Sequence, residues 1–520
     1  MSFKNKVVYQ IWPRSFQDSN GDGIGDLPGI LSRLSYLKNL GVDLIWLSPV
    51  YKSPNHDYGY DVEDYQSIHP DFGSMEDMER LIREAERLNM GILMDLVANH
   101  TSDTHAWFQE ALKDPTGEMG DFYYFREGVK GGPPNNWMSA FGGSAWQKDE
   151  KSGLYYLTTF TPHQPDLNWS NPKLRQAIYD MMNFWMDKGI HGFRLDVINL
   201  IDKKEGLPSV ATKDPLAFPF DEIISLPKSH DYLQEMNREV FSKYDYSFSV
   251  GEGMLLTPED LCLYTKTSRN ELNMCFQFDL LLLGCGELGK FDFRKGYRWN
   301  VKDFKNIFKT WQESSQICDG WVGNFLSNHD GPRAVSRYVH KNHRRSGAKA
   351  LGLLNMTLRG TPFLYQGEEI GMTNQKLDQE DWKDFEAKNT YKLLQSMFHL
   401  PKFIAKRIIN KMSRDQGRSP MQWSSKKHAG FSTTTPWMKL NPNYTEINVQ
   451  DESKHPDSIL RFYQTLIELR KNHLSLQEGR VKWIEVKDPL MAYTRQHGEE
   501  RLLVLINFSP KKTKIPKGLL

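Results

Sequence analysis

The fold of this chain is decided by the stretch Gly192-Phe193-Arg194-Leu195-Asp196-Val197, in which apolar and charged residues alternate. Successive side chains of a β-strand point to opposite faces, so the apolar residues of this stretch would pack outward under helices. Arg194 and Asp196 would then share the inner face. A buried carboxylate needs a partner, and a neighbouring arginine keeps it ionised and therefore nucleophilic. A purely structural Arg–Asp pair in the interior is the alternative for this stretch alone.

Seven further apolar segments resemble this one, and most of the eight precede an amphipathic stretch. The eight are Val7–Trp12, Val42–Pro49, Gly91–Val97, Gly192–Val197, Ser247–Glu252, Leu272–Phe278, Val322–Ser327 and Thr361–Tyr365. Helix candidates between them include Met75–Leu88, Pro172–Lys188 and His343–Leu358. Strands that alternate with helices indicate a parallel sheet, and eight of them predict an α/β protein with a closed (β/α)8 TIM barrel.

The spacing of the segments predicts additions to the barrel. Residues 101–169 form too long an excursion for an ordinary loop, so we expect a small inserted domain after the third strand. The barrel itself would comprise residues 1–100 and 170–473, with Ser458–Lys471 as its last helix. Short strands at Leu490–Tyr493 and Leu502–Asn507 predict a C-terminal antiparallel β-domain over residues 474–520.

Two more acidic residues stand at predicted strand ends, Glu252 between two glycines and Asp330 beside His329. A parallel barrel gathers such ends on one rim, where barrel enzymes carry their chemistry. Cleavage of a glycosidic bond needs one carboxylate as nucleophile and one carboxylic acid as proton donor. Asp196 would attack, Glu252 would hold the proton, and Asp330 would stabilise positive charge at the sugar ring.

Composition excludes several other classes of protein. The chain has 520 residues, with 66 Lys and Arg against 65 Asp and Glu, so charge gives no reason to expect nucleic acid or an anionic membrane as partner. We see neither a signal peptide nor an apolar window long enough for a bilayer. The four cysteines lack ligand-like or disulfide-like spacing, which favours buried reduced thiols in a cytoplasmic protein.

Five motifs give the chain a resemblance to glycoside hydrolase family 13, the α-amylase superfamily, and within it to the oligo-1,6-glucosidase and α-glucosidase branch. They are Asp95–His100, Gly192–Asn199, Val250–Glu252, Asn328–Asp330 and Ser413–Trp423. The resemblance covers essentially the whole chain. It implies a retaining mechanism with Asp196 as nucleophile, Glu252 as acid/base and Asp330 as transition-state stabiliser, and nucleophile and acid/base carboxyl groups about 5 Å apart.

The resemblance also implies a pocket for a terminal glucose. Tyr60 would stack on the sugar, and its hydroxyls would bond to His100, Arg194 and His329. Asp57 and Arg414 would hold the non-reducing end and make the enzyme exo-acting. A surface salt bridge is the alternative for Arg414, and a satisfied core histidine is the alternative for His100.

A loop near the N-terminus, Asp18-Ser19-Asn20-Gly21-Asp22-Gly23-Ile24-Gly25-Asp26, places oxygen-bearing side chains at alternate positions. It opens like a calcium loop but lacks the closing glutamate, because Gly29 occupies that position, so it is not an EF-hand. The resemblance implies a structural Ca²⁺ held by Asp18, Asn20, Asp22, Asp26 and the carbonyl of Ile24, with no organic cofactor. A metal-free Asx-turn loop is the alternative.

The residue after the nucleophile bears on the linkage that is cleaved. Val197 resembles the α-1,6-preferring members of the branch, whereas alanine or threonine goes with α-1,4. Three features depart from the group: His56 and Tyr58 replace its usual Asp and Asn, Leu195 replaces Met, and the segment Leu280–Gly286 differs. The chain also ends at Leu520, earlier than is usual, so we expect an abbreviated terminal domain.

We therefore expect an exo-acting α-glucosidase that acts on isomaltose-like oligosaccharides, with α-1,4 or sucrose activity open. Trehalose-6-phosphate hydrolase is the first alternative and needs cations for a phosphate; Lys203 and Lys204 are present but could be solvated. A sucrose isomerase is the second alternative; such enzymes carry an arginine- and aspartate-rich segment where this chain has Leu280–Gly286, which argues against it. Non-enzymatic relatives lose the catalytic acids, which are all present here. We expect a monomer or weak homo-oligomer whose partner is a small oligosaccharide.

Overall fold

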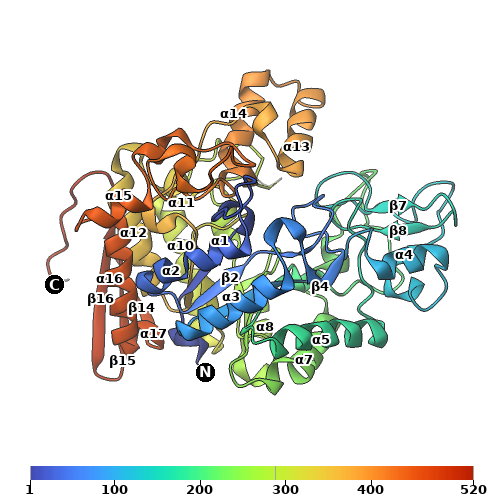
Figure 1. Ribbon diagram of the computed structural model, residues 1–520, viewed down its shortest axis with the longest axis horizontal. Coiled ribbons are helices and arrows are strands. Elements are labelled where there is room, and N and C mark those ends of the chain that lie inside the picture. Colours follow the sequence, from blue (N-terminus) through green and yellow to red (C-terminus); the bar gives the residue numbers. More distant parts are fainter. Residues whose placement is uncertain (1, 287–288, 519–520) are drawn as a thin grey trace. The chain divides into compact units, whose positions relative to one another are not determined.

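The computed structural model describes residues 2–286 and 289–518 (Figure 1). Eight strands form a closed barrel in the order β1-β13-β12-β11-β10-β9-β5-β2. Their bounds are β1 Val8–Ile11, β2 Leu44–Leu47, β5 Gly91–Val97, β9 Gly192–Asp196, β10 Phe248–Gly251, β11 Met274–Phe276, β12 Val322–Asn324 and β13 Thr361–Tyr365. Each of the eight predicted segments contains one of these strands, so the predicted TIM barrel is confirmed.

Strands β9 and β10 show why the sequence forms this sheet. They pair in parallel, with Arg194 beside Val250 and Phe193 beside Ser249. Every residue of both strands is buried, as parallel strands covered on both faces require. Gly192 begins β9 at φ 138°, and a Cβ there would lie 1.8 Å from the carbonyl oxygen of Phe248. Only glycine permits this approach of the two strands.

The longer helices follow the strands as the amphipathic pattern predicts. They are α3 Met75–Arg87, α5 Pro172–Asp187, α7 Pro227–Glu239, α8 Pro258–Thr265, α10 Val301–Ile317, α12 Arg344–Thr357 and α16 Ile459–Asn472. Helix α5 shows the local cause: the Asn171 side chain accepts a hydrogen bond from the backbone N–H of Lys173, and Pro172 occupies the first turn. Gly189, at φ 96°, follows the helix end.

A small antiparallel sheet lies within residues 101–169. Its strands are β6 Phe125–Arg126, β7 Trp146–Lys148 and β8 Tyr155–Leu157, in the order β6-β8-β7. Helix α4 (Ala106–Lys113) packs on it, since the Phe108 ring lies 5.0 Å from the ring of Tyr156; α4, β7 and β8 are cyan and teal in Figure 1. The sheet has the character expected of an inserted domain, whose boundaries stay a prediction.

The C-terminal part forms a second antiparallel sheet, as predicted. Strands β14 Arg480–Ile484, β15 Leu490–His497 and β16 Glu500–Asn507 follow one another in order. Met491, Tyr493 and Ile506 share one buried cluster with Leu354 of α12 and Phe304 of α10. Alternate apolar residues of β15 and β16 therefore pack this sheet against helices α10 and α12.

The described residues divide into two compact units. One comprises Leu47–Ile82 and Ile92–Cys275, and the other Ser2–Trp46, Arg83–Gly91 and the chain from Phe276 onward. No helix within residues 2–286 and 289–518 is long and apolar enough to cross a membrane.

The cysteines correct one expectation. Cys275 and Cys285 are buried free thiols, as predicted. Cys262 and Cys318 are each disulfide-bonded, so the prediction of reduced thiols is wrong for these two. Sequence spacing missed them because partners in a disulfide need only be close in space.

Candidate active site

The predicted site residues fall into two groups, one in each compact unit. Asp57, Tyr60, His100, Arg194, Asp196, Val197 and Glu252 belong to the unit that contains β9 and β10. His329, Asp330, Arg414 and the loop of residues 18–26 belong to the other. Asp196 is the last residue of β9, and Glu252 directly follows β10, so both stand where the sequence places them.

Arg194 is the centre of the first group. Its Nη1 donates to Asp95 Oδ1 at 2.7 Å and to Asp196 Oδ1 at 2.6 Å. Its Nη2 donates to Glu252 Oε2. All four side chains are buried, so one guanidinium neutralises part of the charge of three carboxylates. Asp196 and Glu252 therefore flank the same cation.

Burial raises the pKa of Asp196 to about 6, and the negative charge of Asp95 adds to this rise. Arg194 opposes it, as does the hydrogen bond with Glu252. The sequence predicted an aspartate held ionised by its arginine. The structure adds that desolvation and the neighbouring carboxylate of Asp95 raise the pKa of Asp196. Asp196 is therefore ionised in neutral solution but protonated in mildly acidic solution.

Val197 follows the predicted nucleophile in a strained backbone conformation. It lies at φ 35° and ψ 41°, in the left-handed region that a β-branched residue rarely adopts. Its backbone N–H points at Glu252 Oε2, 3.2 Å away, and the N–H of Ile198 donates to the carbonyl of Glu252 at 3.0 Å. Such strain persists only where surrounding contacts hold it, which is common at functional sites.

The predicted sugar-binding side chains of this unit converge on Gln164. The Gln164 Nε2 lies 3.1 Å from His100 Nε2 and donates to the carbonyl of Tyr60 at 3.2 Å and to Asp57 Oδ2 at 3.5 Å. The Tyr60 hydroxyl donates to Asp95 Oδ2 at 3.1 Å. Asp57, Tyr60 and His100 thus form one hydrogen-bonded group. Burial lowers the pKa of His100, which favours a neutral ring.

Lys203 is a structural residue and not a solvated one. Its Nζ lies 3.0 Å from Asp166 Oδ2 with both side chains fully buried, and it donates to Asn99 Oδ1 at 2.9 Å. Lys204 is half-exposed and pairs with Glu222 at 2.8 Å. The idea that both lysines are solvated charges is therefore wrong for Lys203. Its charge is committed to a buried ion pair that the sequence spacing could not reveal.

In the second unit, Asp330 is surrounded by basic side chains. Its Oδ2 lies 3.0 Å from His329 Nε2, and its Oδ1 accepts from Arg418 Nη2 at 3.1 Å. Burial opposes ionisation of Asp330, but His329, Arg418 and Arg414 hold its pKa well below the usual range. His329 is fixed by Gln10 at 2.7 Å, so Asp330 is a permanently charged, oriented carboxylate.

Arg414 is buried, which excludes the surface salt bridge weighed for it. It donates to Asp384 Oδ1 through Nε at 2.9 Å and Nη2 at 2.8 Å, and its Nη1 lies 3.8 Å from Asp330 Oδ1. Although burial opposes it, Arg414 lowers the pKa of Asp384 to about 2. These two hydrogen bonds to one carboxylate oxygen fix the guanidinium, whose Nη1 lies on the side of Asp330.

The loop of residues 18–26 is ordered by its own side chains. Asp18 accepts from the N–H groups of Gly21 and Gly23, Asp22 from that of Ile24, and Asp26 from those of Ser19 and Gly29. Oxygen donors of this kind suit Ca²⁺. However, in residues 2–286 and 289–518 the three aspartates do not form a set whose ligand atoms all lie within 4.8 Å of one another. Calcium binding stays a prediction.

Sequence reasoning missed four residues that hold the predicted ones: Asp95, Gln164, Asp384 and Arg418. A signal existed for Asp95, because it lies in the motif Asp95–His100 and pairs in register with Arg194 on the neighbouring parallel strand. Gln164 lies in the inserted segment and Asp384 in a long excursion, where no periodicity places a side chain.

Comparison with known proteins identifies the family. The family model described as alpha amylase, catalytic domain, matches residues 10–479. An oligo-1,6-glucosidase of Parageobacillus thermoglucosidasius is 47% identical over 98% of this chain and 91% of that relative. A trehalose-6-phosphate hydrolase of Bacillus licheniformis superposes with a TM-score of 0.93 at 42% identity, covering 99% and 92% of the two chains. An isomaltulose synthase of Erwinia rhapontici NX5 superposes with a TM-score of 0.93 at 43% identity, covering 97% of this chain and 90% of that one.

A closed (β/α)8 barrel with paired carboxylates at its strand ends defines a barrel glycoside hydrolase. The chain belongs to the alpha-amylase family, glycoside hydrolase family 13, as the resemblance implied. The relatives carry the names of different enzymes, an oligo-1,6-glucosidase, a trehalose-6-phosphate hydrolase and an isomaltulose synthase, so membership establishes the class of enzyme but not its substrate.

Proposed function

We propose that the protein is an exo-acting, retaining α-glucosidase that releases terminal α-1,6-linked glucose from short oligosaccharides such as isomaltose. The observation that carries this proposal is the shared guanidinium of Arg194, which bonds both Asp196 and Glu252. Two carboxylates on one guanidinium lie close together, as double displacement requires, whereas an inverting enzyme needs room for a water between them.

In the proposed reaction, Asp196 attacks the anomeric carbon while Glu252 gives its proton to the leaving glycosidic oxygen. The bond between sugar and leaving group breaks as the ester between Asp196 and the glucose forms. Glu252, now a carboxylate, then takes a proton from water, which attacks the ester and releases glucose with retained configuration. Burial raises the pKa of Asp196 to about 6, which leaves it ionised for attack near pH 7.

Asp330 would stabilise the positive charge that develops on the sugar ring in the transition state. Its surroundings support this role, because His329, Arg418 and Arg414 hold its pKa low and keep it charged over the whole working pH range. A residue that is always ionised is unsuited to carry a proton but suited to electrostatic stabilisation.

The substrate pocket would use the hydrogen-bonded group of Asp57, Tyr60, His100 and Gln164. Asp57 and His100 present polar atoms that already share Gln164, so sugar hydroxyls can replace bonds within an existing network. Arg414, held by Asp384, is the residue to which the family resemblance assigns recognition of the non-reducing end, which would limit the enzyme to chain ends. Val197 is the residue that we connect with the preference for α-1,6 bonds.

Trehalose 6-phosphate is the competing substrate, because relatives of both kinds match at similar identity. Hydrolysis of that substrate needs cations available for a phosphate. The two candidates from the sequence are engaged elsewhere, Lys203 with Asp166 and Lys204 with Glu222. These pairs favour the uncharged disaccharide.

The experiment that tests the substrate is a comparison of initial rates on isomaltose, maltose, sucrose and trehalose 6-phosphate with one enzyme preparation. A clear preference for isomaltose supports the proposal. A preference for trehalose 6-phosphate would contradict it and assign the second function, and isomaltulose formation from sucrose would assign an isomerase.

The mechanism has its own test. We expect Asp196→Asn and Glu252→Gln each to lower kcat by several orders of magnitude, because each removes a group that reacts covalently or transfers a proton. Thermal unfolding of each variant shows whether the fold survives. Near-wild-type turnover by a folded variant would contradict the double-displacement mechanism.

We also propose that the loop of residues 18–26 binds a structural Ca²⁺ through the oxygens of Asp18, Asn20, Asp22 and Asp26 and the carbonyl of Ile24. Its hard oxygen donors and short, glycine-interrupted spacing support this. Such an ion would fix the loop and take no part in bond cleavage.

A further inference from the structure

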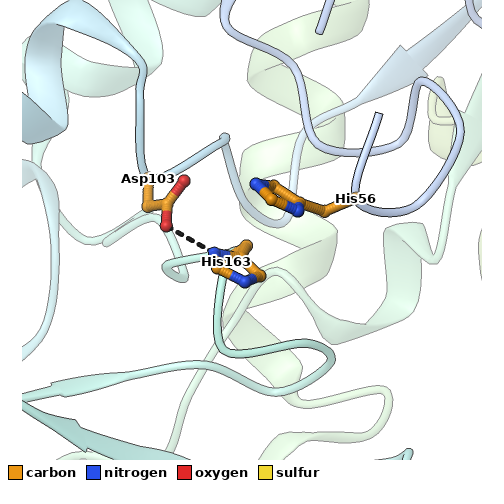
Figure 2. Close-up of side chains that lie close together, drawn as sticks. All are labelled: His56, Asp103 and His163. Carbon is orange, nitrogen blue, oxygen red and sulfur yellow. Dashed lines mark hydrogen bonds and ion pairs between the residues drawn. The ribbon is translucent and has the colours of Figure 1, made fainter. Parts of the chain in front are cut away.

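Outside the proposed sugar pocket, two histidines and an aspartate come together from three separate places in the sequence. They are His56, Asp103 and His163, all in the unit that contains β9, and Figure 2 shows their side chains facing one another. One ligand atom from each lies within 4.8 Å of the other two. The rings of His56 and His163 are stacked, with centroids 3.8 Å apart and planes at 10°.

The backbone that carries these side chains is firmly held. The N–H of Asp103 donates to the carbonyl of His163 at 2.9 Å, which joins the two segments directly. The N–H of His56 donates to Asp61 Oδ2 at 2.7 Å, and Asp61 is itself buried. The three residues are therefore brought together by the fold and not by chance contact of mobile loops.

The donor set identifies the kind of ligand. Two imidazole nitrogens and one carboxylate oxygen suit Zn²⁺, with a water in the fourth position, and suit Ca²⁺ or Mg²⁺ poorly because these prefer oxygen. In a tetrahedral zinc site the ligand atoms lie about 3.3 Å apart. Because the two rings are stacked nearly parallel, the exposed side chain of His56 would have to turn so that its nitrogen faces the same ion as His163.

The contact between Asp103 and His163 supports the same assignment. The His163 Nδ1 lies 2.7 Å from Asp103 Oδ2, so these two atoms already lie near the spacing of two ligands on one ion, and Zn²⁺ would take the place of the proton between them. Two histidines without a third ligand would bind a metal only weakly, so the carboxylate of Asp103 is needed for the site. We propose that His56, Asp103 and His163 form a Zn²⁺ site on the surface of this unit.

Two residues of the proposed zinc site are sequence neighbours of residues in the proposed sugar-binding group. His56 precedes Asp57 and His163 precedes Gln164, and the side chains of Asp57 and Gln164 are 3.5 Å apart. A metal that bridges the two histidines would hold together the two segments that carry this contact.

The test is calorimetric titration of metal-free, untagged protein with zinc chloride, and with magnesium chloride as the ion that the donor set disfavours. The variants are His56→Ala, His163→Ala and, as the matched control, His343→Ala, which removes an exposed histidine from the other unit. We expect saturable 1:1 binding of Zn²⁺ but not Mg²⁺, weakened at least about tenfold in the first two variants and unchanged in the control.

His56→Ala is the decisive variant, because an exposed side chain can be removed without unfolding the protein. Absence of saturable zinc binding by the wild-type protein would overturn the proposal. So would unchanged affinity in His56→Ala or His163→Ala, or an equal loss in His343→Ala. Because binding is measured without sugar, the result is independent of the proposed glucosidase activity.

Discussion

Replacement of Arg194 by methionine removes the guanidinium that bonds Asp95, Asp196 and Glu252 and leaves three buried carboxylates together. An opposite charge at hydrogen-bond distance lowers the pKa of a carboxyl group by about 1–3 units. Burial already raises the pKa of Asp196 to about 6 with the arginine present. Without it we expect a pKa of about 7–9.

This shift sets the size of the effect. At pH 7, a group with a pKa of about 6 is about 90% ionised, and the same group with a pKa of about 7–9 is about 50% to 1% ionised. The acidic limb of the kcat/KM profile, which reports ionisation in the free enzyme, should therefore move to higher pH in Arg194→Met. Loss of the buried partner should also cost about 3–5 kcal/mol of stability.

Asp95→Asn is the matched variant, for which we expect the pKa of Asp196 to shift in the opposite direction. Asp95 raises the pKa of Asp196, so an amide of the same shape should move the acidic limb to lower pH. The assay is kcat/KM for an aryl α-glucoside across the pH range in which each variant stays folded. Shifts in the same direction, or no shift in either variant, would refute the electrostatic account of Asp196.

Three further predictions concern Val197, Lys203 and the loop of residues 18–26. Val197→Thr should raise the ratio of maltose to isomaltose activity, and an unchanged ratio would remove Val197 as the cause of the linkage preference. Lys203→Met should lower Tm by about 3–5 °C, because it leaves the carboxylate of Asp166 buried without its partner at a cost of about 3–5 kcal/mol. A selective loss of trehalose 6-phosphate activity at unchanged Tm would instead identify Lys203 as a phosphate ligand. Chelation of Ca²⁺ should lower the wild-type Tm by about 2–3 °C and leave Asp18→Asn unaffected, and equal responses would exclude the loop as the calcium site.

The fold was predictable because its determinants are local and repeated. The alternation in Gly192–Val197 and the short apolar runs of the other strands follow from the period of a strand, and the helices between them follow from an apolar face. The same rule placed Asp196 and Glu252 at strand ends. The strained backbone of Val197 was not foreseen, because no local propensity favours a β-branched residue at φ 35°.

The surroundings of the proposed catalytic carboxyl groups, Asp196 and Glu252, were predicted only where strand register carries information. Arg194 and Asp196 lie on one face by periodicity, but the contact with Glu252 depends on how two strands align. Gln164 and Asp384 come from irregular segments, whose course is set by tertiary contacts. The buried partner of Lys203 was missed for the same reason, since Asp166 lies in the inserted segment.

The charge balance of the cluster around Arg194 has a cost in stability and a use in catalysis. Three carboxyl groups share one guanidinium, and with the proton on Glu252 that the proposed mechanism requires, the cluster carries a net charge of −1 in a buried site, which opposes folding. A transition state with oxocarbenium character brings a positive charge to the same place and is attracted more strongly than the neutral substrate. Replacing Asp95 with a neutral residue should therefore stabilise the protein and slow the reaction, and the two effects together would separate an electrostatic role from a purely structural one.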